Sequence, residues 1–425
     1  MGEISRRTAI TAAAVVAAPV VAAAGRGLED WFDWFPFFRD TAAEPDALDA
    51  TQEAATQAPA ASGRVPAYGP NGTHWPATTP RPGDAGVRAV DVDCSWAAIA
   101  SAISGASDAD VAAGLHIRVR PGVLPGFGAG ASARPVLKGL GKATWKKNIL
   151  VSPRDGWGTV TITDPARIVG VDGVTFARID TRYVLLTDCV RTAWAQAKVS
   201  QGLKIAASAR AVTACDLYEV VMADAKIDPN DPFSFAAGIG ASLRDCVWEG
   251  CYIAPVFREL GSSNHIDAAQ MSGNGVYRGL TVRDSTFFGA LNCALQLGGP
   301  KASDPNKGTP YVTLDRVILA SQTTALRVRY TMPAGAYQPT IGQAINGTGE
   351  PGQLFAKDSY VFGSMYDTRW GSVERSFTSY ERAIERNTAV SGGWQFDSTM
   401  NSWGAAEFDA LTPTPTDEYL RSIWR

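Results

Sequence analysis

The sequence predicts an all-β fold in which the chain winds as a parallel β-helix, a solenoid of short stacked strands. Short β-type runs recur at intervals of about 26 to 39 residues across residues 184–330, and such a period is typical of solenoids, whose coils bury their apolar faces against one another. A second set of alternating runs follows the first, so each coil holds two strands. No ten-residue helical pattern separates successive runs, which argues against the helical crossovers of a βαβ sheet.

The first set of runs defines one column of equivalent positions. These runs are residues 184–190, 212–217, 243–248, 282–288 and 314–319. Their alignment places in one column Cys189, Cys215, Cys246, Ser285 and Arg316. We expect the three cysteines to be buried free thiols. No Cys-x-x-Cys or Cys/His spacing indicates a zinc site.

The second set of runs defines a column of long polar side chains. These runs are residues 201–205, 265–271, 292–297 and 324–328. Gln270, Gln296 and Arg327 take equivalent positions in successive coils, and Lys204 fits the same column two coils earlier. Such a row can bind sugar hydroxyls or a uronate carboxylate, or it can be an inward amide ladder that satisfies its own hydrogen bonds.

This repeat pattern resembles the pectate-lyase-like right-handed β-helix superfamily over residues 91–330. The superfamily includes polysaccharide-active enzymes and phage tailspikes, so the resemblance implies right-handed winding and a polysaccharide ligand. Neither the clustered Asp pattern of polygalacturonases nor the Arg/Lys pattern of pectate lyases stands out here, so no catalytic residue is carried over from the family.

The N-terminal end of the solenoid is predicted to begin with a capping helix. Residues 95–103 have a Ser95 N-cap with Ile99 and Ile103 on one face, which is typical of a short amphipathic helix. Residues 115–120 then alternate strictly, as a half-buried strand does. A helix at this place would cover the apolar stack that the first coil leaves unpaired.

The chain divides into four predicted segments. They are an export signal or anchor helix at 1–25, an aromatic cluster with a Pro/Ala-rich linker at 26–86, the β-helix at 87–335 and an irregular, capping region at 336–425. Arg6 and Arg7 before an Ala/Val run resemble a twin-arginine export signal. The alternative is an Ala-rich helix that stays on the protein as an assembly anchor.

Charge and composition narrow the class of partner. Charged residues make up 19% of the chain and the net charge is −3, so the basic surface that nucleic acid requires is not expected. We expect a polysaccharide partner and an extracellular or cell-surface location, with a virion tail as the alternative. A homotrimer or a larger surface assembly fits either location.

The candidate chemistry centres on His265 and Asp267, which share one strand face because side chains alternate with a period of two. Glycoside hydrolysis needs two carboxylates, and three acidic loop residues could pair with Asp267. They are Asp224, Asp228 and Asp231. The pair His265 and Asp267 can also serve only to orient its loop.

A β-elimination lyase needs a base and a cation instead of two carboxylates. The base would be His265 or Lys301, and the cation Arg327 or a bound calcium ion. No other cofactor is expected, and no metal site is predicted from the sequence.

The sequence therefore predicts a surface or extracellular β-helix protein that binds a polysaccharide, as a hydrolase or lyase if it is catalytic. The alternative is a non-catalytic subunit of a phage tail or tailspike type that binds a host-surface receptor. A third possibility is an adhesin-like cell-wall protein, which would bind glycan without turnover.

Overall fold

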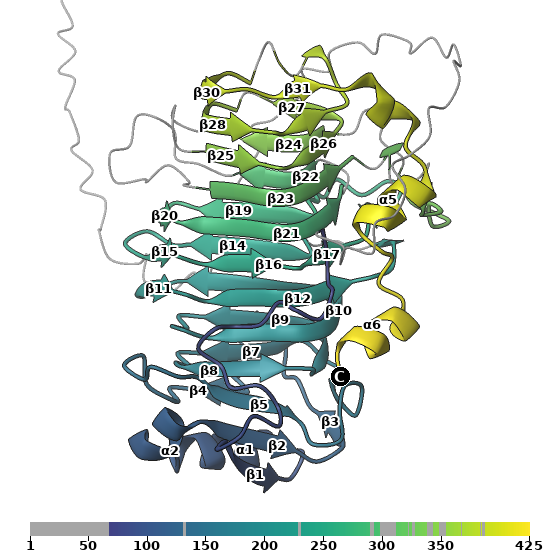
Figure 1. The fold of residues 1–425 in the computed structure, drawn as a ribbon. Coiled ribbons are helices and arrows are strands. Elements are labelled where there is room, and N and C mark those ends of the chain that lie inside the picture. Colours follow the sequence, from purple (N-terminus) through teal and green to yellow (C-terminus); the bar gives the residue numbers. More distant parts are fainter. Residues whose placement is uncertain are drawn as a thin grey trace, which may run out of the picture.

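The computed structural model shows a tall stack of parallel strands, with two helices at its N-terminal end and the C-terminal residues running back along its side (Figure 1). The structure describes residues 68–130, 133–227, 231–289, 293–297, 312–321, 323–324, 328–337, 343–347, 354–366, 368–382, 384 and 387–425. The predicted signal, aromatic cluster and most of the linker lie outside these residues. Within the described part, no helix has the length and apolar character that a membrane crossing requires.

One ladder of parallel strands runs the full height of the stack. Each strand pairs with its equivalent in the coils before and after it. Its strands are β1 (Arg88–Val92), β2 (Leu115–Val119), β5 (Ile149–Pro153), β8 (Val174–Ala177), the first part of β10 (Ala193–Ala207), β12 (Asp216–Met222), β16 (Val247–Glu249), β17 (Tyr252–Ile253), β21 (Leu280–Phe288), β23 (Val312–Ala320), β25 (Leu354–Lys357), β26 (Tyr360–Phe362), β28 (Trp370–Glu374), β29 (Phe377–Thr378), β30 (Ala389–Gly392) and β31 (Gln395–Phe396).

A second parallel ladder alternates with the first along the chain. It contains β3 (Gly122–Leu124), β4 (Leu137–Lys138), β6 (Val160–Ile162), β7 (Ala166–Val169), β9 (Asp180–Thr187), the second part of β10, β14 (Phe233–Ala237), β19 (Ala269–Gly273), β22 (Cys293–Leu297), β24 (Gln343–Gly347) and β27 (Ser364–Tyr366). Two shorter ladders lie at the corners. They are β11 (Ala211–Thr213), β15 (Ser242–Arg244) and β20 (Val276–Arg278), and the pair β13 (Lys226–Ile227) and β18 (Val256–Phe257). The predicted parallel stacking of successive coils is confirmed.

The interior of the stack is filled by side chains from facing strands. Trp248 stacks on Phe235 with ring centroids 4.5 Å apart, and Phe176 stacks on Trp194 at 5.1 Å. The predicted burial of the three cysteines in the first column is confirmed, and the cysteines of the chain are free thiols. Burial of these apolar side chains stabilises the fold, and the stacked aromatic pairs add a further contribution. This interior is therefore the main source of stability.

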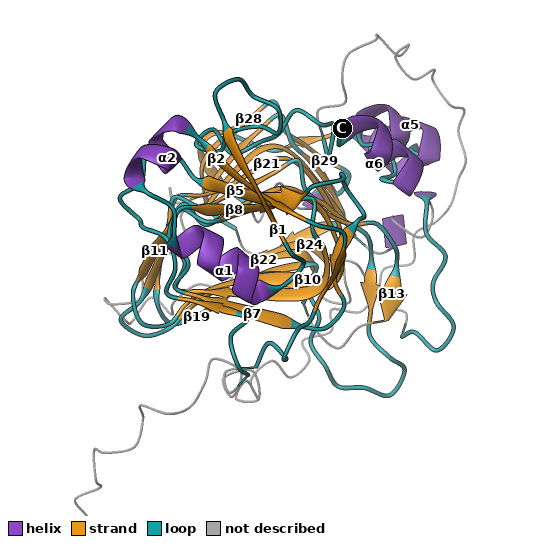
Figure 2. Ribbon diagram, turned by 90° about the horizontal axis from the view of Figure 1, so that it is seen from below, coloured by secondary structure: helices purple, strands orange, loops and turns teal. Residues whose placement is uncertain are grey.

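The predicted capping helix is confirmed. Helix α1 (Trp96–Ser104) begins at the N-cap Ser95, whose side chain accepts a hydrogen bond from Ala98 N. Figure 2 shows α1 lying across the N-terminal end of the coils, beside α2 (Asp108–Ala113). Its buried residues Trp96, Ile99 and Ile103 join the main core, so the first coil does not expose its apolar interior.

The predicted register of the first column is wrong at three of its four steps. Thr192, and not Cys189, stands opposite Cys215, because Ala193 pairs with Asp216. The step from Cys215 to Cys246 is correct. Cys246 and Ser285 do not share a column, because Ser285 stands opposite Cys251. In the next coil Ser285 pairs with Val317, so Arg316 does not share its column either.

Gly250 interrupts the strand between β16 and β17 with φ +66°. The same left-handed bend recurs at Glu219, Asp284 and Arg316, and an earlier bend lies at Ala214 and Asp245. The sequence alignment matched Cys246, which follows the earlier bend, with Ser285, which follows the later one.

The C-terminal part is more regular than predicted. Strands β24 to β31 continue both ladders beyond residue 335, where the sequence indicated irregular structure. The run 324–328 was predicted as a strand, but the next strand of the second ladder is β24, and residues 323 and 324 are helical. Short strands with irregular spacing give too weak a periodic signal to detect.

The last residues pack along the outside of the first ladder. They form a 3₁₀ helix, η2 (Ser398–Ser402), and helices α5 (Ala405–Leu411) and α6 (Asp417–Ile423). Phe408, Leu420 and Trp424 are buried against Tyr252 and Phe288 of the ladder.

Candidate functional site

The predicted residues Asp231 and Asp267 lie one coil apart, each just before a strand of the second ladder. Phe233 of β14 pairs with Ala269 of β19, which brings the preceding aspartates side by side. The backbone N–H of Asp267 donates to Asp231 Oδ1 at 2.8 Å. Of the three acidic residues proposed as partners of Asp267, Asp231 is the one that the structure brings to it.

The carboxylate of Asp267 is buried and saturated with hydrogen bonds. Its side chain has 0% exposure. It contacts His265 Nδ1 at 3.1 Å and accepts from Gln270 Nε2 at 3.3 Å. The backbone N–H and the thiol of Cys293 donate to its other oxygen at 3.1 and 2.9 Å. A group held from so many sides keeps a fixed position but does not itself reach a ligand.

His265 is the accessible member of this cluster. Its side chain is 55% exposed, and Nδ1 is held by Asp267. Among the described residues, no partner contacts Nε2. Burial lowers the pKa of His265, but the hydrogen bond and charge of Asp267, with the charge of Asp231, outweigh it and raise the pKa above its ordinary value. The arrangement is an imidazole with one nitrogen anchored and the other directed away from its anchor.

The carboxyl group of Asp231 has a strongly raised pKa. Burial and the neighbouring charge of Asp267 raise its pKa to about 7, against the lowering effects of the Asp267 N–H, His265 and Lys204. Two adjacent buried carboxylates repel each other when both are ionised, so one of them retains a proton more readily than an exposed acid does.

Part of this geometry is a structural device that recurs elsewhere in the stack. An aspartate at a coil corner accepts the backbone N–H of the next coil at Asp172, Asp180 and Asp216, each at 2.9 Å. Asp231 and Asp267 make the same bond, to Asp267 N and Cys293 N. What distinguishes Asp267 is the exposed histidine on its remaining oxygen.

The predicted polar row is confirmed in part. Gln270 pairs with Gln296, and Lys204 reaches the same column through Ser234. The position after Gln296 belongs to Asn346, so the predicted equivalence of Arg327 is wrong. An intervening segment longer than the sequence alignment assumed moves the next strand to β24. The row of Gln270, Gln296 and Asn346 therefore presents three amides.

The remaining predicted site residues are not joined to this cluster. Asp224 is exposed in the turn after β12 and forms no hydrogen bond or ion pair with Asp267. Three predicted residues lie outside the described part of the chain. They are Asp228, Lys301 and Arg327.

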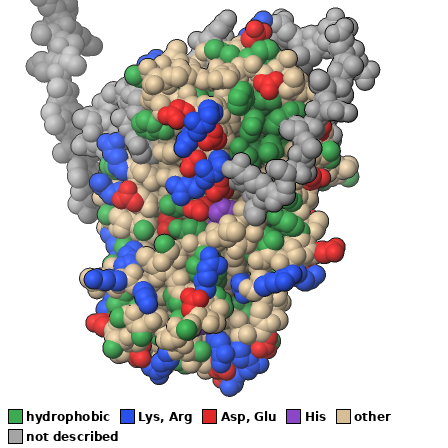
Figure 3. Space-filling view, viewed as in Figure 1, with side chains coloured by type: hydrophobic (Ala, Val, Ile, Leu, Met, Phe, Trp, Pro, Cys, Tyr) green, Lys and Arg blue, Asp and Glu red, His purple; other side chains and the backbone are tan. Residues whose placement is uncertain are grey.

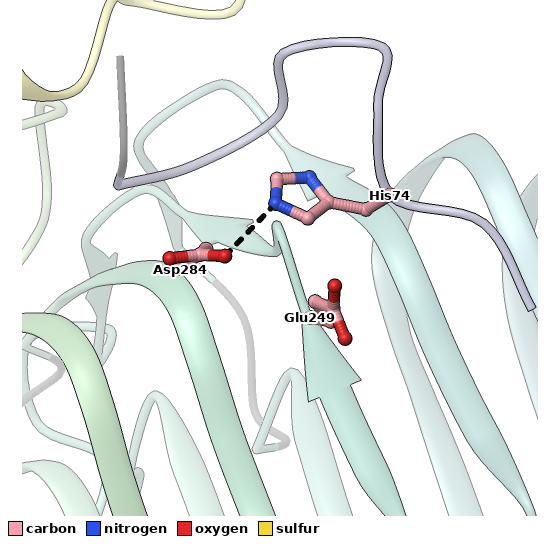
Figure 4. A group of neighbouring side chains, drawn as sticks. All are labelled: His74, Glu249 and Asp284. Atoms are coloured by element: carbon pink, nitrogen blue, oxygen red, sulfur yellow. Dashed lines mark hydrogen bonds and ion pairs between the residues drawn. The ribbon is translucent and has the colours of Figure 1, made fainter. Parts of the chain in front are cut away.

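A second histidine cluster, which the sequence did not indicate, lies on the first ladder. His74 Nδ1 lies 2.9 Å from Glu219 Oε1, and His74 Nε2 lies 3.2 Å from Asp284 Oδ2. Figure 4 shows His74 descending from the N-terminal segment toward Glu249 and Asp284, which belong to successive coils. In the space-filling view, acidic and basic side chains gather in a band over this face (Figure 3).

Gly250 makes room for this histidine. The backbone is left-handed at Glu219, Gly250 and Asp284, which stack at one bend of successive coils. A Cβ atom at Gly250 would collide with His74 Nδ1, so the imidazole takes the space that a side chain would fill there. His74 and Glu219 are 145 residues apart, and nothing in the local sequence links them.

The charges around His74 form a connected network. Arg316 binds Asp284 at 2.5 Å and Asp315 at 3.0 Å, and Arg283 lies 3.5 Å from Glu249 and 3.3 Å from Asp315. Burial lowers the pKa of His74, but its hydrogen bonds to Asp284 and Glu219 and their charges raise it to about 9. The network holds the N-terminal segment against the coils.

The third histidine, His116, is buried at the N-terminal end. Its Nε2 lies 2.7 Å from Ser152 Oγ. Burial and the charges of Arg118 and Arg178 lower its pKa to about 4, so the ring is neutral near pH 7. It lines a cavity of about 260 Å³ together with these arginines.

Solved structures similar to this chain include an alginate lyase and a PL6 family polysaccharide lyase. An alginate lyase from Paenibacillus sp. str. FPU-7 has 12% identity, covers 72% of this chain and 95% of its own, and gives a TM-score of 0.26. A PL6 family polysaccharide lyase from Pseudopedobacter saltans has 12% identity, covers 77% and 96%, and gives a TM-score of 0.17. No family model and no curated protein matches the chain. The functional argument therefore rests on the site itself.

Proposed function

We propose that this protein binds an acidic polysaccharide beside β19 and β22 and cleaves it by β-elimination, with His265 as the base. One observation carries the proposal. An imidazole with 55% exposure is anchored through Nδ1 on a carboxylate of 0% exposure, which is the arrangement by which a buried acid orients a catalytic histidine.

The proposed reaction uses these two residues in different roles. Neutral His265 takes the proton on the carbon α to the uronate carboxyl group through Nε2. The electron pair forms a carbon–carbon double bond and expels the glycosidic oxygen, which leaves with a proton from solvent. Asp267 holds the ring and stabilises the imidazolium that forms.

Elimination fits this site better than hydrolysis. Hydrolysis needs two carboxyl groups that flank the scissile bond. Asp267 is fully buried and bonded on both oxygens, and Asp231 binds the Asp267 N–H. Neither acid is placed to protonate a leaving group, whereas a single accessible base is sufficient for proton abstraction.

The amide row supplies the binding surface in this proposal. Gln270 and Gln296 follow His265 and Asp267 along neighbouring strands, and the Gln270 Oε1 atom is buried without a partner among the described residues. Amides offer both donors and acceptors to sugar hydroxyls. Arg327 or a bound calcium ion remains the predicted cation for the uronate carboxylate.

We extend the proposal to the winding and location of the chain. Parallel strands joined through a crossover almost always wind right-handed, so we propose a right-handed β-helix. The Arg6–Arg7 pair before an apolar run supports export to the extracellular space or cell surface.

A binding protein without turnover is the second candidate. The three amides of Gln270, Gln296 and Asn346 stand in one row, and such a row can hold a glycan with no chemistry at all. This is the function expected of a tailspike-like or adhesin-like subunit.

The test is a panel of acidic and neutral polysaccharides, read for unsaturated product by ultraviolet absorbance and for new reducing ends. We expect unsaturated product from an acidic glycan, and a loss of about 10²- to 10⁴-fold in rate for His265→Gln. Asn264→Ala is the matched control, because Asn264 is an exposed neighbour in the same loop. Glycan binding without product from any substrate would establish the second candidate instead.

A further inference from the structure

We propose that His74, Glu249 and Asp284 form a binding site for a divalent transition-metal ion of the zinc type. The site lies on the first ladder, apart from the His265 cluster on the second, and the proposal does not depend on the proposed function.

The three side chains converge on one point. His74 comes from the N-terminal segment, Glu249 from β16 and Asp284 from β21 (Figure 4). One ligand atom from each lies within 4.8 Å of the other two. Ligand atoms bonded to one zinc ion at about 2.1 Å lie roughly 3–4 Å apart, so only a small inward movement is needed.

The histidine is already oriented as a metal ligand. Nδ1 faces Glu219, and Nε2 faces the carboxylate of Asp284. Glu219 is itself fixed by the backbone N–H of Gly72 at 2.7 Å and by Trp424 Nε1 at 2.6 Å. A carboxylate on the distal nitrogen of a ligating histidine sets its tautomer and raises its basicity.

The local charge is suited to a dication. Four carboxylates belong to the connected network, those of Glu219, Glu249, Asp284 and Asp315, against the two guanidinium groups of Arg283 and Arg316. A bound ion takes the place of the proton on Nε2 of His74, and the network then carries two excess negative charges, which a divalent ion balances. Arg316 binds mainly Asp284 Oδ1, and its second contact, to Oδ2, is longer at 3.2 Å.

The ligand types select the class of ion. One imidazole and two carboxylates suit zinc, manganese or cobalt, whereas calcium prefers six or more oxygen ligands. Three protein ligands leave a coordination position for water or an anionic group. The bound ion would also fasten the N-terminal segment to two coils of the stack.

The test uses the full chain, stripped with a chelator and titrated with Zn²⁺, Co²⁺, Mn²⁺ or Ca²⁺. We expect Zn²⁺ to raise Tm by about 3–5 °C, Co²⁺ to give a visible ligand-field absorption, and Ca²⁺ to have little effect. Both the Tm shift and the absorption should disappear in His74→Gln and remain in the control His265→Gln.

Glu249→Gln provides a second variant in case His74→Gln fails to fold, because Glu249 is half-buried and makes no direct bond to His74. We expect a weaker Zn²⁺ response from it. A Zn²⁺ response unchanged in both variants, or none in the parent protein, would overturn the proposal. So would a nitrogen NMR signal of doubly protonated His74 at saturating Zn²⁺, since that ring could not bind the ion.

Discussion

Two histidine–carboxylate clusters of this molecule differ in how many ring nitrogens the protein uses. His74 has 5% exposure and a carboxylate on each nitrogen, whereas His265 has 55% exposure and a carboxylate on one. Both have a raised pKa for the same reason, a nearby acid that outweighs burial. Only His265 keeps a nitrogen for chemistry with a polymer in solution.

The comparison teaches that pairing chemistry alone does not identify an active site. Around His74 the partners fix a chain segment in place, and around His265 they fix a ring that stays accessible. Assignment of a histidine as the catalytic base therefore depends on access to its second nitrogen. The variants below test this difference, from the largest expected effect to the smallest.

The His74 cluster should be more sensitive than the His265 cluster to an added side-chain atom. Gly250→Ala places a Cβ against His74 at φ +66°, which displaces the ring from two carboxylates. We expect a loss of about 3–5 kcal/mol in the free energy of unfolding, measured with urea. Gly240→Ala is the control, since Gly240 has φ +80° but nothing within 4 Å, and should lose only about 1 kcal/mol. Equal losses in both variants would contradict the packing of His74 on Gly250.

Substitution of each histidine should separate an effect on stability from an effect on activity. His74→Gln removes a ring between two acids, and we expect it to lower the free energy of unfolding by about 3 kcal/mol. His265→Gln should change it by no more than about 0.5 kcal/mol, because its ring is largely exposed. Chelator-treated protein keeps bound metal from affecting this comparison. A larger loss for His265→Gln would make that residue structural.

Asp231, the acid next to Asp267 in the His265 cluster, should make the free energy of unfolding depend on pH. Asp231 has a folded-state pKa of about 7 against an ordinary value of 3.8. Its contribution to stability is therefore complete below pH 3.8 and is lost as the pH rises through about 7. Asp231→Asn remains neutral and can still accept the Asp267 N–H. We expect the variant to match the parent near pH 4 and to exceed its free energy of unfolding by on the order of 2 kcal/mol at pH 8. Parallel pH curves for the two proteins would refute the assignment.

Thiol labelling of the cysteines tests whether the interior of the stack is packed as the structure shows. Cys189, Cys215 and Cys246 are buried, and burial raises the pKa of each thiol. We expect a thiol reagent to leave them unlabelled until the protein is denatured, while half-buried Cys94 reacts earlier. Rapid native labelling of the three would place them outside the core.

Much of the fold could be predicted because it is periodic. The stacked coils, the capping helix with Ser95, and the pairing of Gln270 with Gln296 all follow from spacing and alternation. The approach of Asp231 to Asp267 was among the predicted alternatives for the same reason, since each residue precedes a strand of neighbouring coils.

The rest depended on contacts that have no local signal. Two different bends look alike in the sequence, Asp245 before Cys246 and Asp284 before Ser285, and the alignment matched one with the other. Asn346, and not Arg327, stands opposite Gln296. His74 meets Glu219 across 145 residues, through a segment whose composition indicated only a linker. Such contacts are set by tertiary packing rather than by periodicity.

The most direct test of the central claim is the pH profile of polysaccharide cleavage by the parent protein and by Asp267→Asn. The parent should lose activity as the pH falls through the raised pKa of His265, because the base is then protonated. Without the Asp267 charge that pKa falls, so the acidic limb of the variant should move to lower pH as its maximal rate decreases. Superimposable profiles would show that Asp267 does not act through His265 and would contradict the proposed site.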